Sequence, residues 1–273
     1  MAETGLPISG TTKVFGCLAH PTSHVRAPTL FNAYFAKANI DAVMVPVDVA
    51  PDGLEAAIKG LLHTPNFHGA AVTIPHKMAL ADLCDELGVV AKITGAVNAV
   101  RLQDGRLYGD NFDGAGFVKG LIDQGHSLAD KSVLMIGAGG ASRAIAYALA
   151  GEPIAKMAVY NRTSQKAEEL VTLVEAYRKT GKISVTDSPN PAGFDIIINA
   201  TSLGLKAGDD MPCDLSLADR SALICDIIMI PEQTAWLIAA QDQGLACHFG
   251  RYMLDSQFDL IGHFIGAMAD STE

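Results

Sequence analysis

The chain has 273 residues, of which 49% are hydrophobic and 18% are charged, so it has ample material for a globular core. This length favours one large domain or two modest ones. The formal net charge of −10 argues against nucleic acid and anionic membrane surfaces as partners, and no apolar run is long enough to cross a bilayer.

The first part of the chain alternates between strand and helix patterns. Apolar runs typical of strands cover residues 13–19, 41–49 and 69–74, and helical spacing of apolar residues covers 29–38, 52–62 and 78–87. Residues 97–102 and 106–108 flank the turn Gln103-Asp104-Gly105, which predicts a hairpin. This alternation predicts a mainly parallel sheet covered by helices.

The second part begins with a helix over 113–123 and continues the alternation. Strands are expected at 132–136, 156–160, 183–186, 194–199, 222–228 and 246–249, and helices at 165–177 and 233–243. An apolar helical stretch over 257–268 is a candidate to pack back on the first part. The sequence therefore predicts an α/β protein of two α/β domains.

A glycine turn joins strand 132–136 to an apolar helical pattern that ends at Ala150. The turn residues are Gly137, Ala138, Gly139, Gly140 and Ala141. A strand, a glycine turn and a helix in succession are typical of dinucleotide binding, because the backbone can approach a pyrophosphate and the helix N-terminus attracts it. Ser142 stands where this fingerprint usually has Gly or Ala.

The residues after the next strand indicate which dinucleotide is bound. An NAD site usually has Asp or Glu there, but this strand ends at Tyr160 and continues as Asn161, Arg162 and Thr163, with Lys166 nearby. An arginine holds a 2′-phosphate, whereas a carboxylate would repel it. The cofactor predicted is therefore NADP, and a solvated Arg162 without a ligand is the plainer alternative.

Polar residues in the first part are candidates for chemistry. Thr73 and Lys77 lie at the end of strand 69–74, where open α/β sheets bind ligands, and a lysine there can relay a proton. Asp113 begins the helix over 113–123 and Asn98 interrupts an apolar strand. A lone lysine after a strand is more often a surface charge, and Asp113 also suits a helix N-cap.

Together these motifs resemble the shikimate and quinate dehydrogenases in order and spacing over almost the whole chain. The VTxPxK pattern of that family stands at residues 72–77, GAVNT at 95–99, GxNTDGxG at 109–116, GAGGA at 137–141, NRT at 161–163, NATSxG at 199–204 and GxxMLxxQ at 250–257. The resemblance implies a split catalytic domain, residues 1–112 plus 251–273, which has a parallel sheet and binds the substrate. It also implies a Rossmann domain for NADP, residues 113–250, inserted into that domain.

The resemblance also implies roles for single residues. Lys77 and Asp113 would be the catalytic pair, and Thr73, Asn98 and Gln257 would line the substrate pocket. The implied cofactor site also includes residues beyond the glycine turn and the NRT motif, namely Asn199, Ala200, Thr201, Ser202, Met229, Gly250 and Met253. The implied reaction is reversible hydride transfer between NADP and a secondary alcohol of a hydroxylated ring acid. Oxidation of shikimate to 3-dehydroshikimate, a step of aromatic amino acid biosynthesis, is the prime candidate.

Five departures from the family pattern replace a polar group with an apolar one, and all fall on the expected substrate pocket. The two serines of the family's first loop, which hold the substrate carboxylate, are Val25 and Ala27, and the other three positions are Ala71, Phe112 and Met229. Arg26, between Val25 and Ala27, either replaces the serines by pairing with a carboxylate or points to solvent. The pattern indicates an outlying branch of the family.

Two alternatives to a shikimate-type enzyme stay open. One is a dehydrogenase for a different ring alcohol, such as quinate or a less polar analogue. The other is a non-catalytic NADP-binding sensor, although Lys77 and Asp113 weigh against it because a sensor needs no proton-transfer pair. Either way the expected partner is a small molecule, and the expected assembly is a monomer or homodimer.

No metal site is expected. His20, His24 and His76 lack the spacing of metal ligands with Cys or carboxylates. The cysteines, Cys17, Cys84, Cys213, Cys225 and Cys247, are widely spaced without a CxxC pair, which fits reduced thiols in the cytoplasm. The first ten residues do not have the pattern of a signal peptide.

Overall fold

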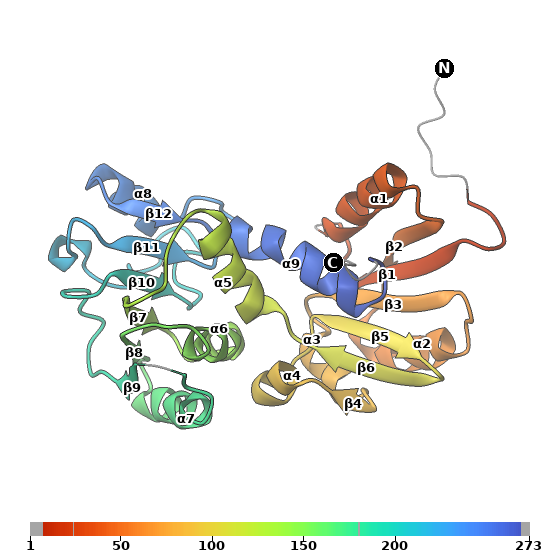
Figure 1. Cartoon of the computed structure of the whole chain (residues 1–273), viewed down its shortest axis with the longest axis horizontal. Coiled ribbons are helices and arrows are strands. Elements are labelled where there is room, and N and C mark those ends of the chain that lie inside the picture. The colour runs from red at the N-terminus through yellow and green to blue at the C-terminus, as the bar shows by residue number, and fades with distance from the viewer. Residues whose placement is uncertain (1–7, 24, 180, 269–273) are drawn as a thin grey trace, which may run out of the picture. The chain divides into compact units, whose positions relative to one another are not determined.

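A computed structural model describes residues 8–23, 25–179 and 181–268 and divides into two compact units (Figure 1). The first unit contains the chain up to Phe112 and from Phe258 onward, and the second contains Asp113–Gln257. The chain therefore leaves the first unit once and returns to it once. The return falls within helix α9, Gly250–Phe264.

The first unit is built on a six-stranded sheet in the order β2-β1-β3-β5-β6-β4. Its strands are β1 Lys13–Ala19, β2 Ala42–Asp48, β3 Phe67–Val72, β4 Glu86–Leu87, β5 Ala99–Gln103 and β6 Arg106–Asp110. The strands β2, β1 and β3 are parallel, and β5 and β6 form an antiparallel hairpin next to β3. Its helices are α1 Ala27–Ala38, α2 Leu54–Leu62 after the short 3-10 turn η1 Pro51–Gly53, α3 Lys77–Ala81 and α4 Val89–Thr94.

Helices cover both faces of this sheet, because successive strand residues point to opposite faces. Phe15 and Cys17 of β1 pack in one buried cluster with Phe31 and Phe35 of α1 and with the end of α9. Residues of α2, α3 and α4 pack in a second cluster with Leu18, from the same strand. The expected packing of the C-terminal apolar stretch on the first part is thus confirmed.

The second unit is built on a parallel six-stranded sheet in the order β12-β11-β10-β7-β8-β9. Its strands are β7 Ser132–Ile136, β8 Lys156–Tyr160, β9 Lys182–Val185, β10 Ile196–Asn199, β11 Leu223–Asp226 and β12 Ala246–His248. Its helices are α5 Asp113–Asp123, α6 Gly140–Ala150, α7 Ser164–Glu175, α8 Ala235–Asp242 and the first part of α9, with the 3-10 turn η2 Leu215–Leu217.

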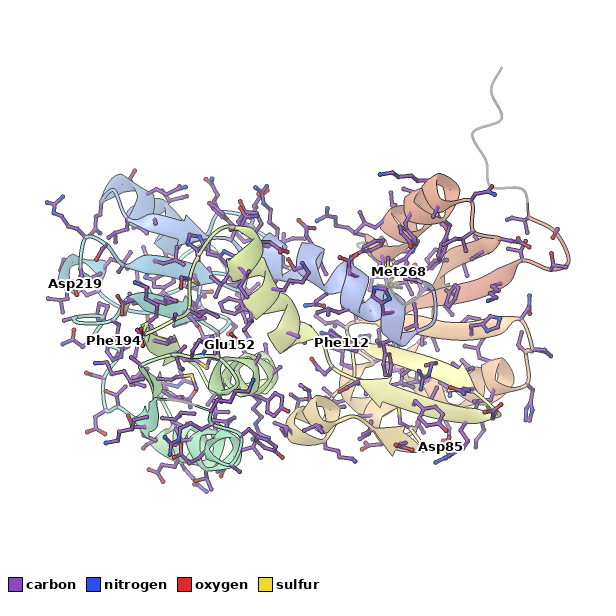
Figure 2. The ribbon with its side chains drawn as sticks, viewed as in Figure 1. Asp85, Phe112, Glu152, Phe194, Asp219 and Met268 are labelled. Carbon is purple, nitrogen blue, oxygen red and sulfur yellow. The ribbon has the colours of Figure 1, made fainter. Side chains whose placement is uncertain are left out.

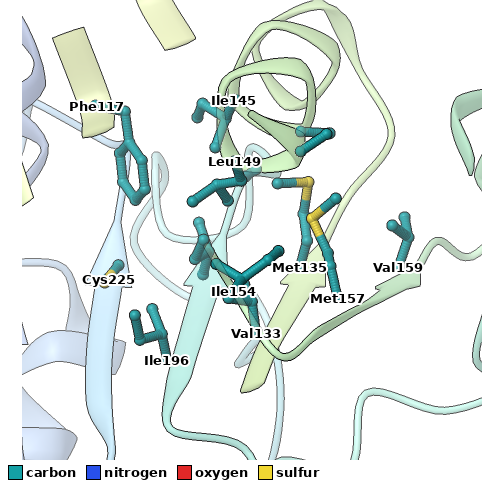
Figure 3. Packing of buried hydrophobic residues seen from close by; sticks show 14 of the residues in the cluster. Phe117, Val133, Met135, Ile145, Leu149, Ile154, Met157, Val159, Ile196 and Cys225 are labelled. Atoms are coloured by element: carbon teal, nitrogen blue, oxygen red, sulfur yellow. The ribbon is translucent and has the colours of Figure 1, made fainter. Parts of the chain in front are cut away.

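Alternation along β7 assigns the layers of the second unit. Val133 and Met135 pack on the face that α5, α6 and α7 cover, and Leu134 and Ile136 pack on the face that α8 covers. Figure 3 shows Met135 on the α6 side, where Ile145 and Leu149 face the sheet. Burial on both faces explains why these strands read as continuous apolar runs in the sequence.

Two helix predictions were wrong. The helix expected over 78–87 ends at Ala81, and residues 86–87 form β4 instead. Asp85 causes this, because its N–H donates to the Leu107 carbonyl over 2.8 Å and its carboxylate accepts the Leu107 N–H over 2.7 Å, which draws the chain onto the sheet edge. The C-terminal helix runs over 250–264 rather than 257–268, and it ends where Gly266 adopts a left-handed φ of 76°.

Candidate active site

Four strands of the second unit end in one row. The register pairs Asp226 with Asn199, Asn199 with Ile136, and Ile136 with Tyr160. The chain continues in one direction from β7 through β8 to β9, and in the other from β10 through β11 to β12, so strand order reverses between β7 and β10. Ligands of open α/β sheets bind at the carboxyl ends of the strands at such a point.

The glycine turn lies at this reversal. Gly137 has a φ of 115°, and a Cβ there would lie 2.7 Å from the Ala200 carbonyl oxygen, so only glycine fits. Gly139 and Gly140 have open space where a side chain would stand. The first amides of α6 have no partner within the helix and carry its positive dipole end, so the residues present fit a dinucleotide pyrophosphate.

Ser142 fixes the shape of this turn, and its role was missed from the sequence. Its hydroxyl accepts the Gly139 N–H over 3.2 Å and donates to the Ala200 carbonyl over 3.1 Å. The side chain is fully buried. A serine at the third fingerprint position therefore ties the turn to the loop after β10, which glycine or alanine could not do.

Of the predicted cofactor residues after β8, one makes hydrogen bonds within the protein and two are exposed cations. Asn161 accepts the Ala138 N–H over 3.2 Å and donates to the Thr163 carbonyl over 2.9 Å, which shapes the loop before α7. Arg162 and Lys166 are exposed, and neither has an ion-pair partner in the described part of the chain. Both cations are thus available to an anion from solvent.

The loops after β10 and β11 contain the other predicted cofactor residues. Asn199 is completely buried and bonded within its own loop, and Ala200 is buried where the glycine turn meets it. Met253 belongs to the buried cluster of the second unit that contains Val133 and Met135, and Met229 is half-buried against the same cluster. Gly250 lies so close to the backbone of the loop after β11 that an added Cβ would be 2.5 Å from the Ile228 carbonyl oxygen.

Asp113 and Gln257 come together within the second unit. Asp113 is 8% exposed at the first turn of α5, where a carboxylate is stabilised by the helix dipole. The Gln257 Nε2 donates to its Oδ1 over 3.3 Å. A Cβ on Gly116 would lie 2.7 Å from the Met253 carbonyl oxygen, so this glycine lets α5 and α9 approach closely enough for the contact.

In the first unit, Thr73 and Lys77 lie where β3 ends. The Thr73 N–H donates to the Leu18 carbonyl over 3.0 Å, and Lys77 begins α3 with its carbonyl accepting the Val97 N–H over 2.8 Å. His76 is buried and its Nε2–H donates to the Val49 carbonyl over 2.8 Å. His76 therefore holds the segment between β3 and α3 in place, and Lys77 itself is half-buried.

Asn98 fixes the end of the first unit's chain before it enters α5. Its Oδ1 accepts the Phe112 N–H over 2.9 Å, and only 2% of Asn98 is exposed. Figure 2 labels Phe112 between β6 and α5. Because Asp113 is the next residue, Asn98 acts on the backbone immediately beside a predicted catalytic residue.

Four of the five apolar departures gather in one place, which we call the Phe112 cluster. It comprises Val25, Ala27, Ala71 and Phe112 together with Phe264, all within the same hydrophobic cluster of the first unit. The Phe112 and Phe264 rings lie 5.3 Å apart. Val25, Ala27 and Phe112 are half-buried, so part of each stays accessible, whereas Arg26 is exposed. The fifth departure, Met229, belongs to the second unit.

Lys77 belongs to the first unit and Asp113 to the second, so their pairing stays a prediction.

No group of three or more His, Cys, Asp or Glu side chains that could hold a metal ion occurs within residues 8–23, 25–179 and 181–268. His24 lies outside the described residues. The five cysteines are free, and burial raises the pKa of Cys17 to about 12, which disfavours its reactive thiolate. None of the helices described is both long and apolar enough to span a membrane.

Comparison with known families gives two matches that together cover most of the chain. Residues 17–100 match the model of the shikimate dehydrogenase substrate binding domain, and residues 121–227 match that of shikimate / quinate 5-dehydrogenase. A shikimate dehydrogenase (NADP(+)) of Rubrobacter xylanophilus is 38% identical over 256 residues, which cover 90% of this chain and 88% of that protein.

Solved structures give the same result for the fold. Shikimate 5-dehydrogenase of Thermus thermophilus, in complex with NADP(H) and shikimate, is 27% identical with a TM-score of 0.81 and 95% of each chain covered. The ligand-free 5-ketofructose reductase of a Gluconobacter strain is 31% identical with a TM-score of 0.82 and 96% of each chain covered. Similarity of fold therefore extends to proteins named for different substrates.

Proposed function

Because this chain belongs to the shikimate dehydrogenase family, we propose that it is an NADP-dependent dehydrogenase that oxidises a secondary alcohol of a hydroxylated ring acid, as in shikimate to 3-dehydroshikimate. The observation that carries the proposal is the row of strand ends at the reversal point, which aligns the glycine turn, Asn161 and Ala200 along one edge. The same chain retains Lys77 and Asp113, the side chains that proton transfer requires.

The reaction divides between cofactor and protein. NADP+ supplies the acceptor for the hydride that leaves the carbinol carbon, and the hydroxyl proton leaves separately. Lys77 and Asp113 would exchange that proton, and Thr73, Asn98 and Gln257 would orient the substrate. The hydrogen bond from Gln257 to Asp113 supports this assignment, since it leaves the carboxylate ordered and still able to accept a proton.

The exposed cations after β8 support NADP over NAD. Arg162 and Lys166 follow a strand that ends without a carboxylate, and a guanidinium can bind a 2′-phosphate through two parallel hydrogen bonds. Thr163 lies between them in sequence. We assign the 2′-phosphate to this loop and the pyrophosphate to residues 137–141 at the start of α6.

A second substrate class is favoured by the Phe112 cluster. Val25, Ala27 and Phe112 have no polar side-chain atoms to bind hydroxyl or carboxylate groups, and a substrate group left without its hydrogen bond loses affinity. A ring acid with fewer hydroxyl groups would then bind better than shikimate. A relative of similar fold that is named a 5-ketofructose reductase supports the view that this fold accommodates substrates other than shikimate.

A turnover screen tests the proposal. The unmutated protein would be mixed with NADP+ and a panel of hydroxylated ring acids, including shikimate and quinate, and NADPH formation would be followed by absorbance. The proposal predicts NADPH formation with at least one acid. NADP+ binding without turnover on any member would instead favour the sensor. The cytoplasmic location and the monomeric or dimeric state remain predictions.

A further inference from the structure

Asp226, at the end of β11, is a buried carboxylate with three hydrogen-bond donors. Its Oδ1 accepts the Ile228 N–H over 3.0 Å and the Asn199 Nδ2 over 3.2 Å, and its Oδ2 accepts the Thr234 hydroxyl over 2.8 Å. None of its surface is exposed. A buried carboxylate is retained at little cost only when donors surround it, so this group is held by a complete set of partners.

The first partner, Asn199, connects Asp226 to the loop after β10 through hydrogen bonds. Its Nδ2 also donates to the Leu203 carbonyl over 2.9 Å, and its Oδ1 accepts the Thr201 hydroxyl over 2.6 Å and the Thr201 N–H over 3.1 Å. The carboxamide thereby makes four hydrogen bonds within the protein. Asn199 has no remaining donor for a ligand, so its influence on one is exerted through the loop it shapes.

The second partner, Thr234, connects Asp226 to the start of α8. The Thr234 hydroxyl accepts the Leu237 N–H over 3.3 Å, as an N-cap does, and so must direct its own proton to Asp226. The segment between Asp226 and Thr234 contains Met229. The Asp226 carboxylate therefore binds both the Ile228 N–H near the start of this segment and the Thr234 hydroxyl at its end, which closes the segment as a loop.

We propose that Asp226 is a positioning residue, which with Thr234 holds the loops after β10 and β11 in the shape that binds the nicotinamide half of NADP. This inference rests on the proposed function, in which the 2′-phosphate binds after β8 and the pyrophosphate at the turn after β7, so that the carboxyl ends of β10 and β11 are left for the nicotinamide half. Asp226 acts through Asn199 and the Ile228 backbone and touches no ligand itself. Thr201 and Met229 are the residues whose places it sets.

The chemistry of the carboxyl group predicts that an amide cannot take its place at position 226. An asparagine keeps one acceptor oxygen and has an NH2 group in place of the other. At least one of the three donors that now bind Asp226 would therefore lose its acceptor. Removing the Thr234 hydroxyl deprives both Asp226 of a donor and the Leu237 N–H of its acceptor. Either change loosens both loops while leaving the Arg162 loop, after β8, unchanged.

The test compares two ligands that share only one half. NADP+ and 2′,5′-ADP would be titrated by calorimetry into the unmutated protein and into Asp226→Asn, Thr234→Val and Thr234→Ser. We expect the dissociation constant of NADP+ to rise roughly tenfold in Asp226→Asn and in Thr234→Val, the loss expected for one well-made hydrogen bond to a charged group. The dissociation constant of 2′,5′-ADP should stay the same in all variants. Thr234→Ser, which keeps the hydroxyl, should bind NADP+ as tightly as the unmutated protein.

Ile197→Val is the matched control, because Ile197 is a buried residue of β10 whose shortening destabilises the sheet without touching the network. It should change the binding of neither ligand. Equal weakening of NADP+ and 2′,5′-ADP in Thr234→Val, or unchanged NADP+ affinity in both variants, would overturn the inference. An unmutated protein that fails to bind NADP+ would overturn the proposed function, and this inference with it.

Discussion

Replacing Arg162 with alanine should remove the preference for NADP over NAD. The guanidinium is exposed at the end of β8 and has no ion-pair partner in the part of the chain that the structure describes. It is therefore free of internal competition for a phosphate. Lys166, in the first turn of α7, is the other predicted cation beside this loop and is also exposed.

The size of the effect follows from that exposure. A hydrogen bond to a charged group contributes about 1.5–3 kcal/mol, and solvent screening of an exposed pair reduces this to about 1–2 kcal/mol. Arg162→Ala should thus weaken NADP+ roughly fivefold to thirtyfold and leave NAD+ unchanged. Raising the salt concentration should shrink the difference between the two cofactors in the unmutated protein.

Dissociation constants for NADP+ and NAD+ would be measured by calorimetry in both proteins. Lys182→Ala is the matched control, because this exposed lysine begins β9 at the opposite end of the parallel sheet and should not affect either constant. Equal constants for NADP+ and NAD+ in the unmutated protein would refute the assignment of Arg162. So would an equal loss of affinity for both cofactors in Arg162→Ala.

Three further predictions concern catalysis, substrate and stability. Lys77→Ala and Asp113→Asn should each lower turnover by about 10²-fold with NADP+ affinity nearly unchanged; near-normal rates in both would make the pair structural. The Phe112 cluster predicts a high Michaelis constant for shikimate, and Arg26→Ala should raise the constant of any acidic substrate, so micromolar saturation or an unchanged constant would contradict these expectations. Burial lowers the pKa of His248 from 6.5 to about 4, so the unfolded chain binds its proton more readily. The free energy of unfolding should then fall by about 3 kcal/mol between pH 6.5 and pH 4 through this group. Urea titrations should show that this loss disappears in His248→Leu but persists in His63→Gln, the control at an exposed histidine. Parallel pH curves for all three proteins would contradict this role of His248.

The regular parts of the fold could be predicted from the sequence because burial determines the spacing of apolar residues. Strands β1, β7 and β8 and helix α5 begin and end at the predicted residues. The helix over 78–87 could not be predicted correctly, since pairing of Asp85 with Leu107 is a contact between residues far apart in the chain. Such long-range hydrogen bonds override local helical spacing.

The candidate site divides in the same way. The glycine turn and the strand-end row follow from local motifs, and the φ of Gly137 explains why the motif needs glycine there. Ser142, His76 and Asp226 were missed as positioning residues, because each acts on a distant loop and no local pattern marks it. The gathering of Val25, Ala27, Ala71 and Phe112 also needed the fold, although each departure was visible in the sequence.

Transfer of deuterium tests the central claim most directly. A ring acid that supports NADPH formation would be labelled at its carbinol carbon, incubated with NADP+ and the unmutated protein, and the reduced cofactor analysed by mass spectrometry and NMR. The account predicts that the label appears on the nicotinamide ring of NADPH, with the rate falling in Lys77→Ala and Asp113→Asn. NADPH without deuterium, or label released to water, would contradict direct hydride transfer.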